Sequence, residues 1–323
     1  MPPGAGFSNE TLLVDATWTQ NGQPVTRELV IRVEPSTHTL YYRAPERFHQ
    51  QASLLQVLGE RTDLPVARVR FAEDDPGVLG GPFFAMDRIP GDTVPDLPAY
   101  NRQGWLHDAT AEQQRALWWT GIEQLAAIHR TDWRGLDLEA HLGPPGTGPQ
   151  LDYFDQFYDW AREDRAYPVI EQTGTWLRDH LPADEPQALC WGDARLANII
   201  YQDYRPAAII DWDLVAIGNP LADLGWWFLV DEVQFRDRHT GDPDDPDGLP
   251  GFPSANDTLA RWSELTRHQS GDIDYYVALA GYKYAICAVR YVGLMTAAGM
   301  PPEAAQYADG MRLGAEQVLT RII

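Results

Sequence analysis

The stretch from Ala188 to Trp227, ALCWGDARLANIIYQDYRPAAIIDWDLVAIGNPLADLGWW, constrains the fold more than any other part of the chain. Two short apolar runs, residues 198–202 and 207–211, lie on either side of a turn-forming segment. This pattern predicts an antiparallel hairpin. An antiparallel pair returns the chain to the edge at which it began. We therefore expect Asn198, which opens the first strand, to lie close to Asp211, which ends the second.

The two residues at this edge carry the oxygen ligands that Mg²⁺ prefers, and this ion usually takes its other ligands from water and substrate phosphates. Asp193 precedes Asn198 by five residues, on the turn that enters the hairpin. It can face the same space without binding the metal. A carboxylate beside a magnesium–phosphate site can orient a hydroxyl group and accept its proton, so the pattern predicts phosphoryl transfer. A single Asp or Asn usually caps a turn, whereas three around one hairpin favour the functional interpretation.

The rest of the chain divides into a strand-rich part and a helical part. Alternating apolar residues at 11–18 and 25–33 predict two strands, and Asn21-Gly22 between them is a strong hairpin signal. One helix and two further strands are expected before a segment rich in Pro and Gly, after which helical periodicity dominates. This order predicts an α+β fold, with a β-rich lobe over residues 1–91 and a mostly helical lobe over residues 92–323.

Composition narrows the expected partners and location. The chain has 47 acidic and 25 basic residues, a formal net charge of −22. Such acidity argues against nucleic acid or an anionic membrane surface as a partner. Two cysteines without a C-x-x-C pair indicate a reducing compartment and no structural zinc. We see no signal-peptide pattern at the N-terminus and no apolar run of about 18 residues. A cytoplasmic protein is therefore predicted, and its oligomeric state stays open.

The motifs WGDARLANIIY and IIDWD resemble the aminoglycoside phosphotransferase and choline kinase-like superfamily, whose pattern is H-G-D-x-x-x-x-N followed by I-D-[FW]. Weaker matches follow in the expected order: GAGFSNET, LVIR, LPVARV, GGPFFAMDRIPG and LAAIHRTDW. The sequence is similar to bacterial phosphotransferase family proteins and to the kinase-like domain fused to some acyl-CoA dehydrogenases. The resemblance implies a two-lobed protein-kinase-like fold.

It also implies an ATP- and Mg²⁺-dependent phosphotransferase that moves the γ-phosphate to a hydroxyl group of a small molecule. An aminoglycoside-type acceptor is favoured, and a macrolide, a choline-like amino alcohol or a hydroxyacyl-CoA remain alternatives. By resemblance, Asp193 is the catalytic base, and Asn198 and Asp211 are the magnesium ligands. Arg195 either steadies phosphate charge or forms a salt bridge within the lobe. Asp213 either approaches the metal or bonds to nearby backbone.

The nucleotide site implied by the resemblance lies between the lobes. Gly6 and Ser8 belong to a glycine-rich loop whose backbone N–H groups can approach phosphate. The strand and hinge that hold adenine correspond to FFAMDRI, where backbone groups of Asp87 and Ile89 would bind the base. ATP is therefore expected under the glycine-rich loop and against this hinge.

Three positions depart from the family pattern. Trp191 stands where the family has histidine. Arg32 stands where kinases place the strand lysine and can still bind α- and β-phosphates. Gln51 replaces the helix glutamate that pairs with that lysine, and we expect its amide to hydrogen-bond Arg32. Trp191, Gln51 and the few residues before the glycine-rich loop keep a nucleotide-binding pseudokinase open as an alternative, although the presence of Asp193, Asn198 and Asp211 argues against it.

Four further polar residues have predicted roles outside this set. Asp223 is interpreted as a cap of the helix that follows the hairpin. His129, near the end of its helix, is interpreted as a packing residue or a partner of the helix dipole, and not as a catalyst. Asp231 and Glu232 fit either a pocket for a cationic sugar or a solvated helix start.

Overall fold

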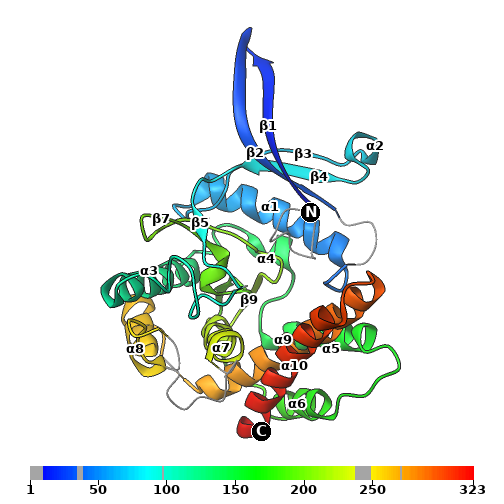
Figure 1. Ribbon diagram of the computed structural model, residues 1–323, viewed down its shortest axis with the longest axis vertical. Coiled ribbons are helices and arrows are strands. Elements are labelled where there is room, and N and C mark those ends of the chain that lie inside the picture. Colours follow the sequence, from blue (N-terminus) through cyan, green and yellow to red (C-terminus); the bar gives the residue numbers. More distant parts are fainter. Residues whose placement is uncertain (1–9, 35–38, 97, 237–248, 270) are drawn as a thin grey trace.

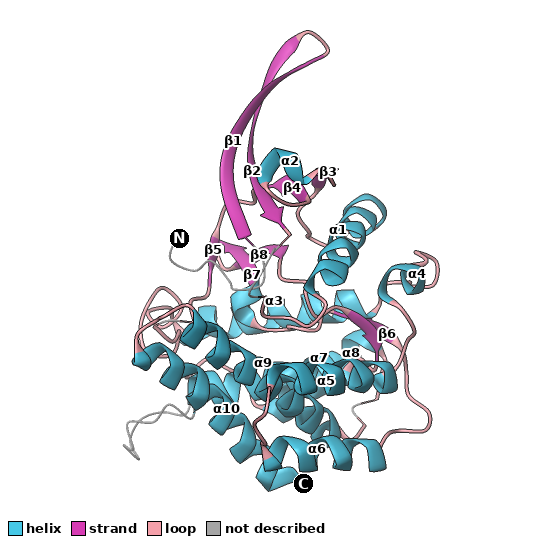
Figure 2. Cartoon of the chain, turned by 90° about the vertical axis from the view of Figure 1, so that its right-hand side faces the viewer, coloured by secondary structure: helices cyan, strands magenta, loops and turns pink. Residues whose placement is uncertain are grey.

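The structure is a computed structural model, and it describes residues 10–34, 39–96, 98–236, 249–269 and 271–323. Figures 1 and 2 show the sheet of the first ninety residues at one end of the molecule, and most helices, with the remaining strands among them, toward the other. The predicted α+β class, with a β-rich N-terminal part and a mostly helical C-terminal part, is confirmed.

The N-terminal sheet is antiparallel, with the strand order β1-β2-β4-β3. Its strands are β1 (Glu10–Gln20), β2 (Gln23–Val33), β3 (Val69–Glu73) and β4 (Phe83–Asp87). The predicted Asn21-Gly22 turn joins the first two strands, and both residues have the positive φ, 51° and 78°, that such a hairpin turn requires. The β1–β2 hairpin projects well beyond the body of the molecule (Figures 1 and 2).

Helix α1 (Ala44–Arg61) lies between this sheet and the helical part (Figure 1). Its predicted apolar stripe is buried, and the ring centroids of Phe48 and Phe84 are 5.2 Å apart where the helix meets β4. Gln51 is 2% exposed because it lies on the same buried face. The helix therefore carries an amide into the interior of the molecule. The short helix α2 (Pro76–Leu79) follows β3.

The predicted central hairpin is also present. It belongs to a sheet of order β5-β7-β8, and a further antiparallel pair, β6–β9, lies beside it. These strands are β5 (Asp92–Thr93), β6 (Ala188–Cys190), β7 (Ile199–Gln202), β8 (Arg205–Ile209) and β9 (Ala216–Gly218). Asp203 and Tyr204, with φ of 50° and 61°, form the turn between β7 and β8. The hairpin edge near β6 is where the predicted site residues lie.

The helical part surrounds this hairpin. Its helices are α3 (Ala111–His129), α4 (Leu138–Leu142), α5 (Thr147–Ala161), α6 (Pro168–Asp179), α7 (Leu221–Val230), α8 (Ala255–Thr266), α9 (Ile273–Ala297) and α10 (Pro302–Ile322). Helix α3 begins with a capping box, in which Thr110 and Gln113 are bonded reciprocally. Helix α7 packs on α9, and Trp227 of α7 meets Trp118 of α3 at 5.5 Å between ring centroids. None of the helices in the described ranges is long and apolar enough to cross a bilayer.

A short segment before α1 bridges the two ends of the molecule. The Tyr153 hydroxyl of α5 donates to the carbonyl of Tyr42 at 2.8 Å, and Arg290 Nε of α9 donates to the carbonyl of Thr39 at 2.9 Å. The chain entering α1 is therefore bonded to two helices of the C-terminal part. This bridge sets the position of α1 over the hairpin edge.

Candidate active site

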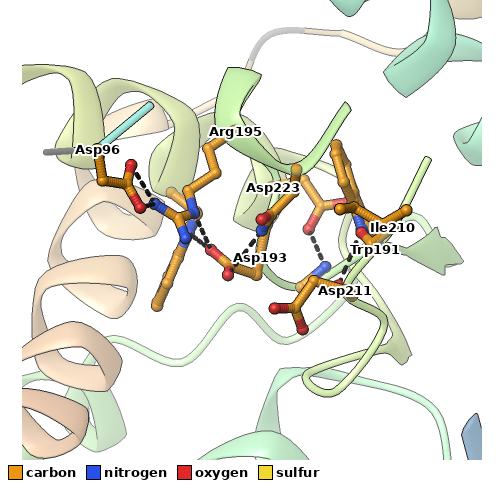
Figure 3. A network of polar contacts seen from close by, with 10 residues as sticks. Asp96, Trp191, Asp193, Arg195, Ile210, Asp211 and Asp223 are labelled. Atoms are coloured by element: carbon orange, nitrogen blue, oxygen red, sulfur yellow. Dashed lines mark hydrogen bonds and ion pairs between the residues drawn. The ribbon is translucent and has the colours of Figure 1, made fainter. Parts of the chain in front are cut away.

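Asp193 lies in the loop after β6 and is 7% exposed. Its Oδ1 accepts a hydrogen bond from Trp226 Nε1 at 2.7 Å, and its Oδ2 accepts one from Asn198 Nδ2 at 2.8 Å. Arg195 Nε is 3.3 Å from Oδ1. Donors from α7 and from the hairpin entrance thus hold the carboxylate in one orientation (Figure 3). Such fixed orientation is what a group that positions a hydroxyl and accepts its proton requires.

Residues 191–195, between β6 and the next element, form a loop that is anchored to α7. This loop is called the catalytic loop below, after the predicted role of Asp193. Gly192 has φ of +94°, and a Cβ there would lie 2.0 Å from the carbonyl oxygen of Leu214, so only glycine fits. The Asp223 carboxylate accepts the backbone N–H groups of Gly192 at 2.8 Å and Trp191 at 2.7 Å. The prediction that Asp223 caps its own helix is wrong. It lies in the first turn of α7, 1% exposed, and its oxygens are directed at the catalytic loop because that loop packs on the helix.

His129 extends this anchor. Its Nε2 is 3.0 Å from Asp223 Oδ2, and Trp262 Nε1 donates to its Nδ1 at 2.9 Å. Because Nδ1 accepts a hydrogen bond, the ring proton lies on Nε2, which donates to the carboxylate. The hydrogen-bonded series Trp262–His129–Asp223 therefore links α8, α3 and α7, and Asp223 at its end holds the catalytic loop.

Trp191, which replaces the family histidine, takes a defined bonding role. Its indole Nε1 lies 3.0 Å from the carbonyl oxygen of Ile210 and 3.1 Å from that of Asp211, and donates to both (Figure 3). The side chain is fully buried. Trp191 thus connects the catalytic loop to the residues that follow the second strand of the hairpin.

The two predicted metal ligands lie at the same end of the hairpin. The N–H of Ile210 donates to the carbonyl of Asn198 at 2.9 Å, which brings the two chain segments together. Their local conformations differ from the prediction. Asn198 ends a 3₁₀ turn, η1 (Leu196–Asn198), and does not open the strand. Asp211 lies beyond the last residue of β8 and has φ of 58°. Both residues thus lie just outside the paired strands β7 and β8.

The donor set fits a magnesium ion. Both hydrogen bonds of the Asn198 amide nitrogen go to Asp193, so the amide oxygen is the atom left for a ligand role. Asp211 Oδ1 is buried and has no hydrogen-bond partner within the part of the chain that the structure describes. Burial, the negative charge of Asp213 and that of Asp193 raise the pKa of Asp211 to about 7. A nearby cation would remove this penalty.

Protein side chains alone would not complete that site. Among the described residues, no group of three or more His, Cys, Asp or Glu side chains is placed to hold a metal ion. A Mg²⁺ ion at Asn198 and Asp211 would therefore need further ligands from water and from a phosphorylated substrate. The arrangement suits an ion that binds together with a nucleotide.

Arg195 forms the salt bridge that was one of its two predicted roles. Its Nη1 is 2.8 Å from both carboxylate oxygens of Asp96, in the segment after β5, while its Nε faces Asp193 (Figure 3). Burial alone would lower the pKa of the guanidinium, but the charges of Asp193 and Asp96 outweigh it and raise the pKa well above its ordinary value. Arg195 stays cationic and holds Asp193 beside it.

Arg32 and Gln51 converge on Asp213. Arg32 Nη2 is 3.5 Å from Asp213 Oδ2, and Gln51 Nε2 donates to Asp213 Oδ1 at 2.6 Å. The expected hydrogen bond from Arg32 to the Gln51 amide oxygen is not formed. That oxygen is buried and has no hydrogen-bond partner among the described residues. The prediction was wrong because the Asp213 carboxylate reaches both groups and is a stronger acceptor than an amide.

The predicted nucleotide-binding positions lie partly outside the described residues. Gly6 and Ser8 fall there. Asp87 ends β4, where its N–H donates to the carbonyl of Arg68 at 3.0 Å and its carboxylate accepts from Arg70 Nε at 2.7 Å. The Asp87 N–H is therefore engaged within the sheet, and the binding of adenine by backbone groups of Asp87 and Ile89 stays a prediction. Ile89 follows the strand and is half-buried.

The acidic pair after α7 lies in the first turn of a π-helix, η2 (Asp231–Arg236), which continues α7. A pocket for a cationic sugar at this pair stays a prediction. Asp231 is buried and accepts a hydrogen bond from the Tyr100 hydroxyl at 2.6 Å. Glu232 pairs with Arg321 of α10. Both carboxylates are thus engaged within the protein.

Sequence reasoning missed two residues that contact the site. Asp96 left no signal, because its partner Arg195 is 99 residues away. Trp226 had a weak sequence signal. It lies three positions after Asp223 on the same helix, and so on the same face. A helix that presents Asp223 to the catalytic loop must present Trp226 near Asp193.

Comparisons with known proteins agree with this geometry. A model of the "Phosphotransferase enzyme family" matches residues 1–264. The chain is 27% identical over 300 residues to "Probable acyl-CoA dehydrogenase IBR3" of Arabidopsis thaliana, covering 87% of this chain but 34% of that protein. The chain thus spans about a third of the length of this relative.

Solved structures share the fold. A candidate aminoglycoside phosphotransferase from Ralstonia eutropha superposes with a TM-score of 0.70 at 20% identity, over 99% of this chain and 95% of that one. The GDP and kanamycin complex of APH(2")-IIIa superposes with a TM-score of 0.58 at 15% identity, over 99% and 92%. The predicted kinase-like fold and the resemblance are confirmed. By the family model, which matches most of its length, the chain belongs to the phosphotransferase enzyme family.

Proposed function

We propose that this small-molecule phosphotransferase uses ATP and Mg²⁺ to transfer the γ-phosphate to a hydroxyl group of its acceptor. Residues 1–91 form the nucleotide-binding lobe in this proposal, and residues 92–323 form the catalytic and acceptor-binding lobe. Asp193 orients the acceptor hydroxyl and takes its proton. Asn198 and Asp211 hold the metal, which neutralises phosphate charge when bound.

One observation carries the proposal. The buried Asp211 oxygen has no partner among the described residues, yet it lies at the hairpin end where Asn198 binds Asp193. A buried carboxylate with an uncompensated oxygen is costly unless a cation binds it. The adjacent Asp193 is fully oriented by donors. Together they pair a cation site with a proton acceptor, which is the combination that phosphoryl transfer to a hydroxyl uses.

The pseudokinase alternative has less support. Trp191 and Gln51 were among its motives, but Trp191 donates to the carbonyls of Ile210 and Asp211 at the predicted metal site. Trp191 thus has defined hydrogen-bond partners, and Gly192 makes the tight turn before Asp193. Both observations support turnover over the pseudokinase alternative.

For the acceptor we propose an aminoglycoside-type amino sugar first and a hydroxyacyl-CoA second. The first rests on the fold shared with the kanamycin complex. The second rests on the sequence identity with an acyl-CoA dehydrogenase relative. Asp231 and Glu232 do not support the amino sugar, because their carboxylates bind Tyr100 and Arg321.

An acceptor screen tests the proposal. ADP release is measured with Mg·ATP and kanamycin-like, macrolide, choline-like and hydroxyacyl-CoA acceptors, and phosphorylated products are identified by mass spectrometry. We expect one class to give turnover above the acceptor-free rate, and Asp193→Asn to lose it. Tight binding of Mg·ATP with no turnover on any class would favour the pseudokinase instead.

A further inference from the structure

Asp213 connects the two lobes through side chains. It is 3% exposed, lies two positions after Asp211 and belongs to the loop between β8 and β9. Gln51 of α1 donates to its Oδ1 at 2.6 Å, and Arg32 of β2 lies 3.5 Å from its Oδ2. A single carboxylate of the C-terminal part thus engages the helix and the central strand of the N-terminal part.

Arg47, also on α1, binds the backbone of the same residue. Its Nη1 donates to the Asp213 carbonyl at 2.9 Å. Its guanidinium lies over the Tyr153 ring, 3.8 Å from the centroid, and so is packed against α5. One turn of α1 therefore contacts both the carboxylate and the carbonyl of Asp213, and any shift of α1 must move the loop that carries Asp211.

The charges explain why position 51 is an amide. Arg32 needs one negative partner, and Asp213 supplies it from the loop. A carboxylate at position 51 would lie against Asp213 at hydrogen-bond distance, where two buried like charges repel strongly. The Gln51 amide instead donates to Asp213. Positions 51 and 213 together carry one negative charge, whether the carboxylate lies on the loop or on α1.

We propose that Asp213 is a positioning residue: from the metal-site loop it supplies the carboxylate that pairs with Arg32, and so aligns β2 and α1 with Asp211. The proposal rests on the nucleotide role of Arg32 and deepens the proposed function. In this assignment, the carboxylate that pairs with Arg32 lies on the loop between β8 and β9. In the kinases that the sequence resembles, the corresponding carboxylate lies on the helix, at the position of Gln51. Asp213 itself touches neither nucleotide nor acceptor in this assignment.

The test moves the carboxylate from position 213 to position 51. The variants are Asp213→Asn, Gln51→Glu and the double variant Gln51→Glu/Asp213→Asn. Glu46→Gln is the matched control, because it removes an exposed carboxylate from the same helix. Binding of ATP is measured by calorimetry with Mg²⁺ and with EDTA, and the unliganded proteins are melted in parallel.

We expect each single variant to weaken ATP binding about ten- to a hundredfold in EDTA as well as in Mg²⁺, the usual effect of losing a charge-assisted contact. The double variant should recover to within about threefold of the parent, and its melting temperature should recover with it. Glu46→Gln should change neither. Recovery by a second substitution distinguishes charge pairing from a general structural role.

Two results would overturn the assignment. If Asp213→Asn loses only the Mg²⁺-dependent part of binding and the double variant does not recover, Asp213 acts on the metal and not on Arg32. If the double variant melts below both single variants, the carboxylate cannot be transposed and the pairing is wrong. Failure of the parent to bind ATP would instead refute the proposed function, while the melting temperatures would still report on the pair.

Discussion

Three buried carboxylates around the site have defined counterparts among the described residues. Asp193 faces Arg195, Asp223 binds two backbone N–H groups, and Asp213 faces Arg32. By contrast, Asp211 Oδ1 lacks a hydrogen-bond partner among the described residues. The chemistry of the site therefore depends on how single residues are compensated, and three predictions concern single residues.

The first concerns the proton acceptor. Asp193→Asn keeps the shape of the side chain but cannot accept a proton, so acceptor phosphorylation should fall by about 10²–10⁴-fold. Affinity for Mg·ATP should change little, because the metal ligands are untouched. ADP release and calorimetry check both quantities, with the exposed Asp159→Asn as control. Undiminished turnover would exclude Asp193 as the base.

The second concerns the donor to Asp193. Trp226→Phe keeps an aromatic ring but removes the indole N–H that binds Oδ1. We expect kcat to fall about tenfold, the lower end for a hydrogen bond to a charged group, while KM for ATP stays the same. Trp227→Phe alters the next residue of the same helix, which is equally buried, and should leave kcat near the parent value. Equal losses in both variants would mean that only packing matters.

The third concerns pH. Burial and the charges of Asp213 and Asp193 raise the pKa of Asp211 to about 7, so the folded protein holds this proton more tightly than the unfolded chain does. The contribution to stability is then lost as pH rises from about 4 to 7. In metal-free buffer, Asp211→Asn should melt above the parent at pH 8, and the difference should shrink as pH falls and vanish below about pH 4. A difference that does not depend on pH would contradict the shift.

At the scale of elements, α7 organises the catalytic loop. From one helix, Asp223 binds the turn before Asp193 and Trp226 binds the carboxylate itself. His129 of α3 then fixes Asp223 from the other side. Precision at Asp193 thus comes from a helix that packs on the loop, and the loop has little freedom of its own.

This arrangement makes Asp223 a stability determinant. Asp223→Ala leaves the buried N–H groups of Trp191 and Gly192 without acceptors, and each unsatisfied group costs about 1–3 kcal/mol. We expect the free energy of unfolding in urea to fall by at least about 2 kcal/mol on that basis, and turnover to fall with it. Asp159→Ala, an exposed helical position, should stay within about 0.5 kcal/mol of the parent. If Asp223→Ala leaves the free energy of unfolding unchanged, water has replaced the carboxylate as the acceptor of these N–H groups.

At the scale of the whole molecule, the lobes meet at the hairpin end. The segment before α1 is bonded to α5 and α9, and α1 is bonded to the loop of Asp213. A nucleotide bound there would contact both lobes. Ligand binding should therefore stabilise the two lobes together in one transition.

Thermal unfolding tests this coupling. ATP at about 100 times its Kd stabilises a protein by about 2.7 kcal/mol, so the melting temperature should rise by several degrees. Mg²⁺ should add to that rise in the parent but not in Asp211→Ala, because the variant lacks one of its two proposed ligands. Asp159→Ala is again the control. If Mg²⁺ stabilises the ATP-bound variant as much as the parent, the metal site lies elsewhere.

The elements that local patterns determine were predictable from the sequence. The Asn21-Gly22 turn, the buried stripe of α1, the Thr110 capping box and the β7–β8 hairpin depend on residues close together in the chain. The hairpin also brought Asn198 near Asp211, because antiparallel pairing alone returns the chain to one edge. Residue spacing therefore determined the fold class and which polar groups meet.

Only the tertiary structure decided how those groups are paired. Asp213 meets Gln51 across 162 positions of the chain, and Arg195 meets Asp96 across 99. Asp223 has the spacing of a helix cap, yet it binds the catalytic loop. Periodicity specifies which face of an element is buried but not which distant partner covers it. The choice among several acceptors within reach is made by packing, burial and charge, and these exist only after the chain has folded.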